Sequence, residues 1–393
     1  MTAQAHSEEA AVLPSQMDWL DAFSEVSDPR REQGTYHALR SLIGIGILGV
    51  ICGADDWEEI HDYGLEKEQW LSKFLELPCG IPSSDTFERV FSAIDPIEFE
   101  KGFRSWVARL LDDVSLDVVA IDGKSHRGSY DRSGGLAALH TVSAWSSEHR
   151  LVLGEVAVAG KSNEITAIPQ LLEMLSLKGA VVTIDAMGAQ KSIVKQIREK
   201  KADYCVALKA NHSNLYKGLH DWLGDTQSSD WQQIEAEYVE QVESGHHRDE
   251  SRKLWAIPVC AFESHPQICE HLAAWQDVGT VVVIERRRQT WRSGAVHLQF
   301  YLSSVEADAQ RLAGIVRSHW SIENQLHWCL DVVFKEDASR IRKGSSARNF
   351  GMLRRLALGL LKRETSHKVS LKRKRYKALL NDEYLCSVLA AGH

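Results

Sequence analysis

The stretch that decides the fold is LDVVAIDGK, residues 116–124, because the helical periodicity of the preceding sequence ends there. Its VVAI segment is a continuous apolar run, as expected of a central strand that is covered on both faces. Asp122 follows that run directly. A second stretch, AVVTIDAMGAQ at residues 180–190, repeats the pattern and places Asp185 after its apolar residues. The sequence therefore predicts two buried strands that each end in an aspartate.

Elements between and after these strands predict one mixed sheet. Two further strands are expected at residues 139–145 and 151–158, helices at 163–177 and 190–200, and a last strand at 204–208. The order β-β-β-α-β-α-β predicts an α/β fold in which an antiparallel start is followed by βα units.

The chain has 393 residues, which is enough for two or three domains. The pattern predicts a disordered tail at 1–16, an all-helical N-terminal domain at 17–112, the first part of the core at 113–211, a mainly β insertion at 212–303, the second part of the core at 304–365 and a basic C-terminal tail at 366–393. Two short helices within residues 83–110 fit a helix-turn-helix or a plain packed hairpin. The hairpin is favoured, because positive charge there is limited to Lys101, Arg104 and Arg109.

The net charge of −8 argues against a nucleic-acid partner, but the distribution of charge argues for one. Residues 340–377 contain fourteen Lys or Arg and one acid, Glu364. Such a run is either a solvated face or a surface that binds the phosphate backbone.

Several features point to a cytoplasmic protein. No apolar run reaches the roughly 20 residues needed to cross a bilayer, so no membrane partner is expected. Residues 1–16 lack a basic n-region, which argues against a secretory signal. The seven cysteines are odd in number and include no CxxC pair, as expected of reduced thiols. Histidine spacings do not match a zinc site, and neither a P-loop nor a GxSxG elbow is present.

The two strand-end aspartates suggest metal chemistry. A carboxylate at the C-terminal end of a buried strand is held on rigid backbone at the rim of the sheet, where ligands bind. Asp122 and Asp185 on neighbouring strands could share one or two Mg²⁺ ions, the arrangement that two-metal phosphoryl transfer needs. The alternative is that each aspartate only caps the turn that follows it.

A third carboxylate favours the metal interpretation. Glu323 lies within RSHWSIENQLHW, residues 317–328, on a predicted helix where it shares one stripe with Leu326 and His327. A buried acid without a cation is costly, and a shared metal would compensate for it. Asp331, Glu336 and Asp337 compete for the same role.

These stretches, together with LKAN at 208–211, resemble the DDE insertion-sequence transposases, and in particular the branch of the H-repeat-associated proteins. The match extends over nearly the whole chain, because Asp28-Pro29-Arg30 and the helical region after it resemble the associated N-terminal domain of that branch. The resemblance implies a ribonuclease-H-like core, a β insertion before the last catalytic helix, and metal-dependent cleavage and transfer of DNA strands.

The resemblance also implies the cofactor and the partners. Asp122, Asp185 and Glu323 would hold two Mg²⁺ ions, for which Mn²⁺ would substitute. The partners would be double-stranded DNA, as terminal inverted repeats and target, and a second copy of the chain in a homodimer or larger assembly. The protein would then be bacterial and associated with the nucleoid. The alternatives are a ribonuclease-H-like nuclease that cuts without joining, and a catalytically inactive or domesticated DNA-binding relative.

Other residues are predicted to contact DNA because of their charge or aromatic ring, with surface solvation as the alternative for each. They are Lys124, Arg127, Lys209, Asn211, His246, Arg248, Arg252, Arg287, Trp291, Arg317, His327, Arg340, Arg342 and Lys343. Many relatives carry a Tyr-Arg-Glu-Lys signature around the third acid, and this chain departs from it, with His319 four residues before Glu323. Arg317 and His327 are therefore candidates to replace the phosphate contacts of the signature.

Overall fold

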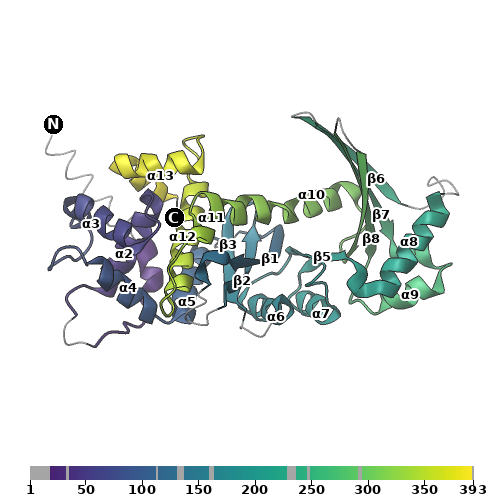
Figure 1. Cartoon of the computed structure of the whole chain (residues 1–393). Helices are drawn as coiled ribbons and strands as arrows, with labels where there is room; N and C mark the ends of the chain where they lie inside the picture. Colours follow the sequence, from purple (N-terminus) through teal and green to yellow (C-terminus); the bar gives the residue numbers. More distant parts are fainter. Residues whose placement is uncertain are drawn as a thin grey trace.

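The chain forms three regions in a row: a helical region, a central α/β core and a long-stranded sheet covered by two helices (Figure 1). The computed structural model describes residues 18–31, 35–111, 114–130, 137–158, 163–227, 236–245, 248–290 and 294–391. Within these ranges, no helix is both long enough and apolar enough to span a bilayer.

A nine-stranded mixed sheet runs through the core and the long-stranded region in the order β3-β2-β1-β4-β5-β9-β8-β7-β6. The strands are β1 (Val118–His126), β2 (Leu139–Ser146), β3 (Leu151–Ala157), β4 (Val181–Ile184), β5 (Asp203–Leu208), β6 (Glu237–Gly245), β7 (Arg248–Pro258), β8 (Thr280–Thr290) and β9 (Gly294–Ser303). β1, β4 and β5 are parallel to one another. β2 pairs antiparallel with β1, and β3 pairs antiparallel with β2 at the edge of the sheet. This five-strand order confirms the predicted ribonuclease-H-like α/β fold.

Helices cover both faces of the core sheet. α6 (Glu164–Met174) and α7 (Lys191–Glu199) lie on one face, and α10 (Ala309–His319) lies on the other against β1 and β4 (Figure 1). α10 leads into a single π-helical turn, η6 (Glu323–His327), and then into α11 (Trp328–Val332). The apolar strand residues are therefore buried on both sides, as their uninterrupted runs predict.

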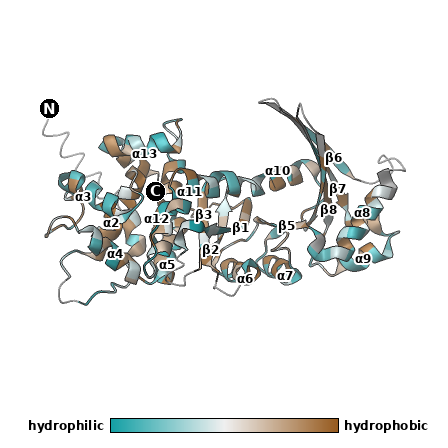
Figure 2. Cartoon of the chain, viewed as in Figure 1, coloured by the Kyte–Doolittle hydropathy of each residue, from teal (hydrophilic) through white to brown (hydrophobic). Residues whose placement is uncertain are grey.

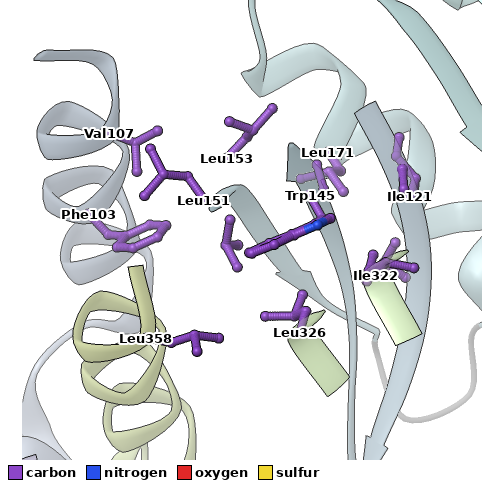
Figure 3. Close-up of a cluster of buried hydrophobic side chains, with 14 of the residues drawn as sticks. Phe103, Val107, Ile121, Trp145, Leu151, Leu153, Leu171, Ile322, Leu326 and Leu358 are labelled. Carbon is purple, nitrogen blue, oxygen red and sulfur yellow. The ribbon is translucent and has the colours of Figure 1, made fainter. Parts of the chain in front are cut away.

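The hydrophobic core continues from the sheet into the helical region without a break. Trp145 of β2 is fully buried, and Figure 3 shows it beside Leu326, with Phe103 of α5 (Pro96–Leu110) and Leu358 of α12 (Ser346–Arg363) nearby. The helical region is therefore packed onto the α/β core and does not stand apart from it.

The helical region combines N-terminal helices with helices from the other end of the sequence. Its further members are α2 (Leu39–Cys52), α3 (Trp57–Leu71), α4 (Ser84–Ala93), α13 (Leu371–Leu380) and α14 (Asp382–Ala390). α2 is almost entirely apolar (Figure 2) and packs against α3, α12 and α13. The segment predicted as a basic tail, residues 366–393, contains α13 and α14, which pack against this region.

The basic stretch at 340–377 is partly a buried ion-pair network. Arg355 is 2 % exposed, and its guanidinium contacts Glu155 at 2.5 Å and Glu336 at 2.8 Å. Arg375 is also buried and contacts Asp55 at 3.1 Å. These cations are compensated by carboxylates of this chain, so the run as a whole is not a phosphate-binding surface.

The helices α4 and α5 both pack into the helical region, and the ring of Phe91 in α4 contacts the ring of Phe99 in α5. Phe99, Phe103 and Trp106 of α5 are buried, and α5 contacts β3 and α12. The positive charges that could have served a DNA-reading helix are paired, Lys101 with Glu25 and Arg104 with Glu100. This packing favours the hairpin over a helix-turn-helix.

Residues 212–303 extend the core sheet. β9 pairs with β5 in antiparallel register, and β6–β8 continue outward from it. α8 (Ser213–Gln227) and α9 (Pro266–Ala273) cover one face of these strands, while α10 reaches the other face (Figure 1). The strands of residues 212–303 and the strands of the core therefore form one sheet. Its long strands are hydrogen-bonded, through β9 and β5, to the strands that carry the aspartates.

We expect replacement of Arg355 by Met to lower the free energy of unfolding by about 3–5 kcal/mol, because Glu155 loses its ion-pair partner and Glu336 is left with Lys124. Urea denaturation followed by circular dichroism measures the change. Lys372→Met, at an exposed position of α13, is the matched control and should stay within about 0.5 kcal/mol of the unaltered chain. An R355M protein as stable as the control would show that the network contributes nothing.

Candidate active site

The register of the parallel strands brings the two predicted aspartates together. Ile121 of β1 pairs with Ile184 of β4, at the last position where the two strands are joined. Asp122 and Asp185 directly follow this pair of residues, so both lie at the end of the pairing between β1 and β4. β1 itself continues to His126, paired only with β2. Asp122 is therefore held by strand backbone on both sides.

The loop after β4 orients the carboxylate of Asp185. Its Oδ1 accepts the backbone N–H groups of Met187 at 3.0 Å and Gly188 at 3.2 Å. A side chain at position 188 would not fit, because a Cβ there would lie 2.3 Å from Ile184 Cγ2. The tight loop thus engages one oxygen of Asp185 and leaves the other for a ligand.

Two residues after β5 hold this loop in place, and Asn211 is the one of them that was predicted to contact DNA. Asn211 Nδ2 donates to the Ala186 carbonyl at 2.6 Å, and the His212 ring nitrogen Nε2 lies 2.7 Å from the Ala189 carbonyl. The amide of Asn211 thus positions the Asp185 loop and is not directed at a phosphate. Lys209, just before them, is exposed.

Glu323 opens the π-helical turn η6, in which the Trp328 N–H donates to the Glu323 carbonyl five residues back. π-helical turns occur frequently at functional sites. Ile322 and Leu326 on either side are fully buried, and Figure 3 shows both in the same core cluster as Trp145. These anchors fix the segment, while Glu323 itself remains accessible.

The carboxyl of Glu323 lies close to that of Asp122. Partial burial raises the pKa of Glu323, and the negative charge of Asp122 and a hydrogen bond with it raise that pKa further. Two acids that share a site in this way favour a proton or a cation between them. The structure thus brings together all three predicted catalytic acids, Asp122 and Asp185 by register and Glu323 by its contact with Asp122.

Two histidines of the same segment face the aspartates. His327 Nε2 lies 3.1 Å from Asp122 Oδ2, and its buried Nδ1 has no hydrogen-bond partner among the described residues. His319 Nδ1 lies 3.1 Å from Thr183 Oγ1. Burial lowers the pKa of His319 although Asp122 and Asp185 oppose the shift, so its ring is neutral at pH 7. His327 is therefore placed to orient Asp122.

A fourth acid, Glu164, completes the group and was missed in the sequence. It lies in the first turn of α6, and His140 Nε2 donates to its Oε1 at 2.8 Å. Burial raises the pKa of Glu164, and the charges of Asp122 and Asp185 add to the shift. The only signal in the sequence was an acid in the first turn of a helix, which the helix dipole already explains.

The competing third acids are committed to protein cations. The buried ammonium of Lys124 lies 2.6 Å from Asp331, 3.2 Å from Glu336 and 3.5 Å from Asp337. Burial alone would raise the pKa of Glu336, but Arg355 and other nearby cations hold it well below its usual value. This arrangement favours Glu323 as the third acid.

Lys124 and Arg127, the basic residues that follow Asp122, both take part in these ion pairs. Lys124 is 7 % exposed, so its ammonium lies in the ion-pair cluster and not at the surface where DNA would bind. The prediction that Lys124 contacts phosphate is therefore not supported. The sequence alone could not show that three carboxylates surround its ammonium group. Arg127 is exposed and lies 3.7 Å from Asp337.

The donor set at this edge suits a hard divalent cation. Mg²⁺ and Mn²⁺ prefer oxygen ligands, and four carboxylates are available here. The raised pKa values of Glu323 and Glu164 indicate charge repulsion that a cation would relieve. Among the described residues no three acids or histidines already converge at ligand distance. A bound cation would therefore draw these side chains closer together.

A groove of about 740 Å³ lies between α10 and the long strands, next to the Glu323 segment. Three arginines line it, Arg252 of β7, Arg286 of β8 and Arg317 of α10, together with Trp320 and Asn324. Arg252 and Arg317 were predicted from the sequence to contact DNA. Only the pairing of β7 with β8 places Arg286 directly opposite Arg252.

The remaining predicted DNA contacts are scattered. Arg287 is exposed and pairs with Glu285 at 2.6 Å. Lys343 pairs with Glu88, Arg342 donates to the Gly128 carbonyl, and Arg340 lines a separate, mostly acidic cavity. His246 and Trp291 lie outside the described residues, and only the backbone of Arg248 is described.

Comparison with known proteins agrees with this geometry. Residues 20–107 match the family model described as DDE_Tnp_1-associated, and residues 114–360 match the Transposase DDE domain. The chain is 38% identical to the putative transposase YncI of Escherichia coli O157:H7, over 95% of this chain and 94% of that one. It is 35% identical to the H repeat-associated putative transposase YhhI of Escherichia coli K12, over 95% and 98%. This chain therefore belongs to the DDE transposase family, in the branch of the H-repeat-associated proteins.

Proposed function

We propose that this chain is an active transposase that binds the terminal inverted repeats of its insertion sequence and catalyses DNA strand cleavage and strand transfer. The observation that carries the proposal is that Asp122, Asp185 and Glu323 lie in the same part of the core. The first two follow the last pair of residues between β1 and β4, and the third lies near Asp122 on a segment anchored in the core. Membership of the family supports the reaction class.

In this proposal the three acids hold two Mg²⁺ ions, for which Mn²⁺ substitutes. When bound, such ions activate the attacking oxygen and stabilise the leaving oxygen of an in-line displacement. Asp185 presents one free oxygen because two backbone N–H groups engage the other. His327 fixes the rotamer of Asp122 through Nε2. The acids therefore act as ligands, and none of them has to carry a proton.

DNA enters the proposal through the groove beside Glu323. Guanidinium groups bind phosphate with two parallel hydrogen bonds, and Arg252, Arg286 and Arg317 line one continuous surface there. Double-stranded DNA could follow this surface to the carboxylates. Lys209 and Arg287 are exposed and are retained as further contacts. We also propose a homodimer or larger assembly on the two element ends, in the nucleoid of the bacterial cytoplasm.

We expect Asp122→Asn, Asp185→Asn and Glu323→Gln each to abolish cleavage and strand transfer while element-end binding persists. Loss of a metal ligand removes several kcal/mol of transition-state stabilisation, which corresponds to roughly a 10³-fold slower rate. The assay uses labelled duplexes from the regions that flank the gene, with Mg²⁺ or Mn²⁺. Asp117→Asn, at a position before β1, is the matched control.

Each result of that assay has a separate meaning. Discrete nicks without joined products would support a plain nuclease of the same fold. Specific binding by the unaltered chain without cleavage under either metal would reject the transposase proposal and leave a DNA-binding relative.

We expect Glu323→Gln to raise the thermal midpoint of the metal-free protein at pH 7. Because the folded pKa of Glu323 is raised from 4.5, its contribution to stability is fully present below pH 4.5 and is lost as the pH rises through the folded value. Differential scanning calorimetry between pH 4 and pH 8 measures this. Mg²⁺ should stabilise the unaltered chain more than the variant. A midpoint of the variant below that of the unaltered chain throughout this range would contradict the repulsion.

We expect replacement of Arg252, Arg286 or Arg317 by Ala to weaken binding to every DNA sequence alike and to reduce the salt dependence of affinity. Each lost phosphate contact lowers the slope of log affinity against log salt by about 1. Fluorescence anisotropy over a salt series measures the slope. Lys178→Ala serves as control, because Lys178 lies just before β4, at the opposite end of the parallel strands. Equal slopes for all four variants would exclude the groove as the DNA-binding surface.

A further inference from the structure

The carboxylate of Glu164 lies directly against the backbone of β1 at Gly123. A Cβ built on Gly123 would lie 2.1 Å from Glu164 Oε1 and 2.9 Å from Oε2. Gly123 is not among the residues with positive φ, so its backbone conformation does not demand glycine. The carboxylate of Glu164 occupies the space next to Gly123, so a side chain at position 123 would require that carboxylate to move.

A chain of hydrogen bonds across three elements orients this carboxylate. Ser125 of β1 stands opposite His140 of β2 in the strand register, and Ser125 Oγ lies 2.8 Å from His140 Nδ1. His140 Nε2 lies 2.8 Å from Glu164 Oε1. A carboxylate only accepts, so Nε2 carries the proton and Nδ1 accepts from the serine hydroxyl. The histidine is thus fixed as one tautomer that engages Oε1 and leaves Oε2 unengaged by it.

The position of Glu164 is unfavourable without a cation. Its side chain is only 13% exposed. The charges of Asp122 and Asp185 both act on it, and Asp122 is the residue directly before Gly123. The contact with His140 offsets this repulsion only in part, because burial and the two aspartates still leave the pKa of Glu164 raised. A structural role alone would be served better by an amide at this position.

We propose that Glu164 is a fourth carboxylate ligand of the metal centre and that His140 is its positioning residue. The inference rests on the proposed function, because it assumes that Asp122, Asp185 and Glu323 hold divalent cations. Four carboxylates carry the charge that two divalent cations balance, whereas three leave an excess positive charge. Carboxylates that bind metals are themselves held by hydrogen bonds, and His140 supplies such a bond to Glu164.

The test measures metal binding directly, without turnover. Mn²⁺ is titrated into the full chain, and free Mn²⁺ is followed by electron paramagnetic resonance at pH 7. We expect Glu164→Gln to lose one Mn²⁺ equivalent or to bind it at least about tenfold more weakly. Glu173→Gln, at an exposed position of the same helix, should bind like the unaltered chain.

A second variant tests the geometry without removing the carboxylate. Gly123→Ala places a methyl group where Glu164 Oε1 lies and should displace it, so Mn²⁺ binding should weaken about as much as in Glu164→Gln. In the double variant Gly123→Ala/Glu164→Gln the two effects should not add, because both act on the same contact. His140→Ala should weaken Mn²⁺ binding in the unaltered chain and have no effect once Glu164 is Gln.

The outcomes separate this inference from the proposed function. If Glu164→Gln binds Mn²⁺ as the unaltered chain does while Asp185→Asn loses it, Glu164 is not a ligand and the three-acid centre stands. Additive effects of Gly123→Ala and Glu164→Gln would also overturn the inference, because the methyl group would then act through Asp122. If the unaltered chain binds no Mn²⁺ with or without DNA, both proposals fail.

Discussion

Mutual repulsion between carboxylates at one edge of the sheet is the constraint on which the rest of the structure depends. The parallel pairing of Ile121 with Ile184 fixes where Asp122 and Asp185 emerge, and no small adjustment of side chains can separate them. Glu323 and Glu164 then approach from two other elements, and both carry a raised pKa. Backbone and core packing must supply the stability that this concentration of charge removes.

The supports of the site are consequently stiff and mostly uncharged. Backbone N–H groups hold Asp185, the amide of Asn211 holds the loop behind it, and the fully buried Ile322 and Leu326 hold the π-helical turn. Ionic compensation is found one step further away, where Lys124 and Arg355 neutralise Glu336. This separation leaves the carboxylates at the rim available to ligands that come from outside the protein.

Local pattern was enough to predict the elements that carry the three acids. The apolar runs before Asp122 and Asp185 identify buried strands, because a short uninterrupted run of β-branched residues is typical of a strand covered on both faces. The burial and the ion-pair partners of charged residues could not be predicted from local pattern. Arg355 lies in a basic run, yet its partner Glu155 is distant in sequence and belongs to β3. Lys124 and Glu164 were misjudged or missed for the same reason, since their partners are brought to them only by the tertiary fold.

The shared helical region has a consequence for biosynthesis. α2 is an apolar helix made early, but the helices that bury it, α12 and α13, are synthesised some 300 residues later. At the usual 5–20 residues per second of translation, roughly 15–60 s pass before that partner emerges from the ribosome. During that time the apolar surface of α2 is exposed, and a chaperone or a transient partner must cover it. A chain that ended before α12 would keep that surface exposed, because α12 and α13 cover it in the complete fold.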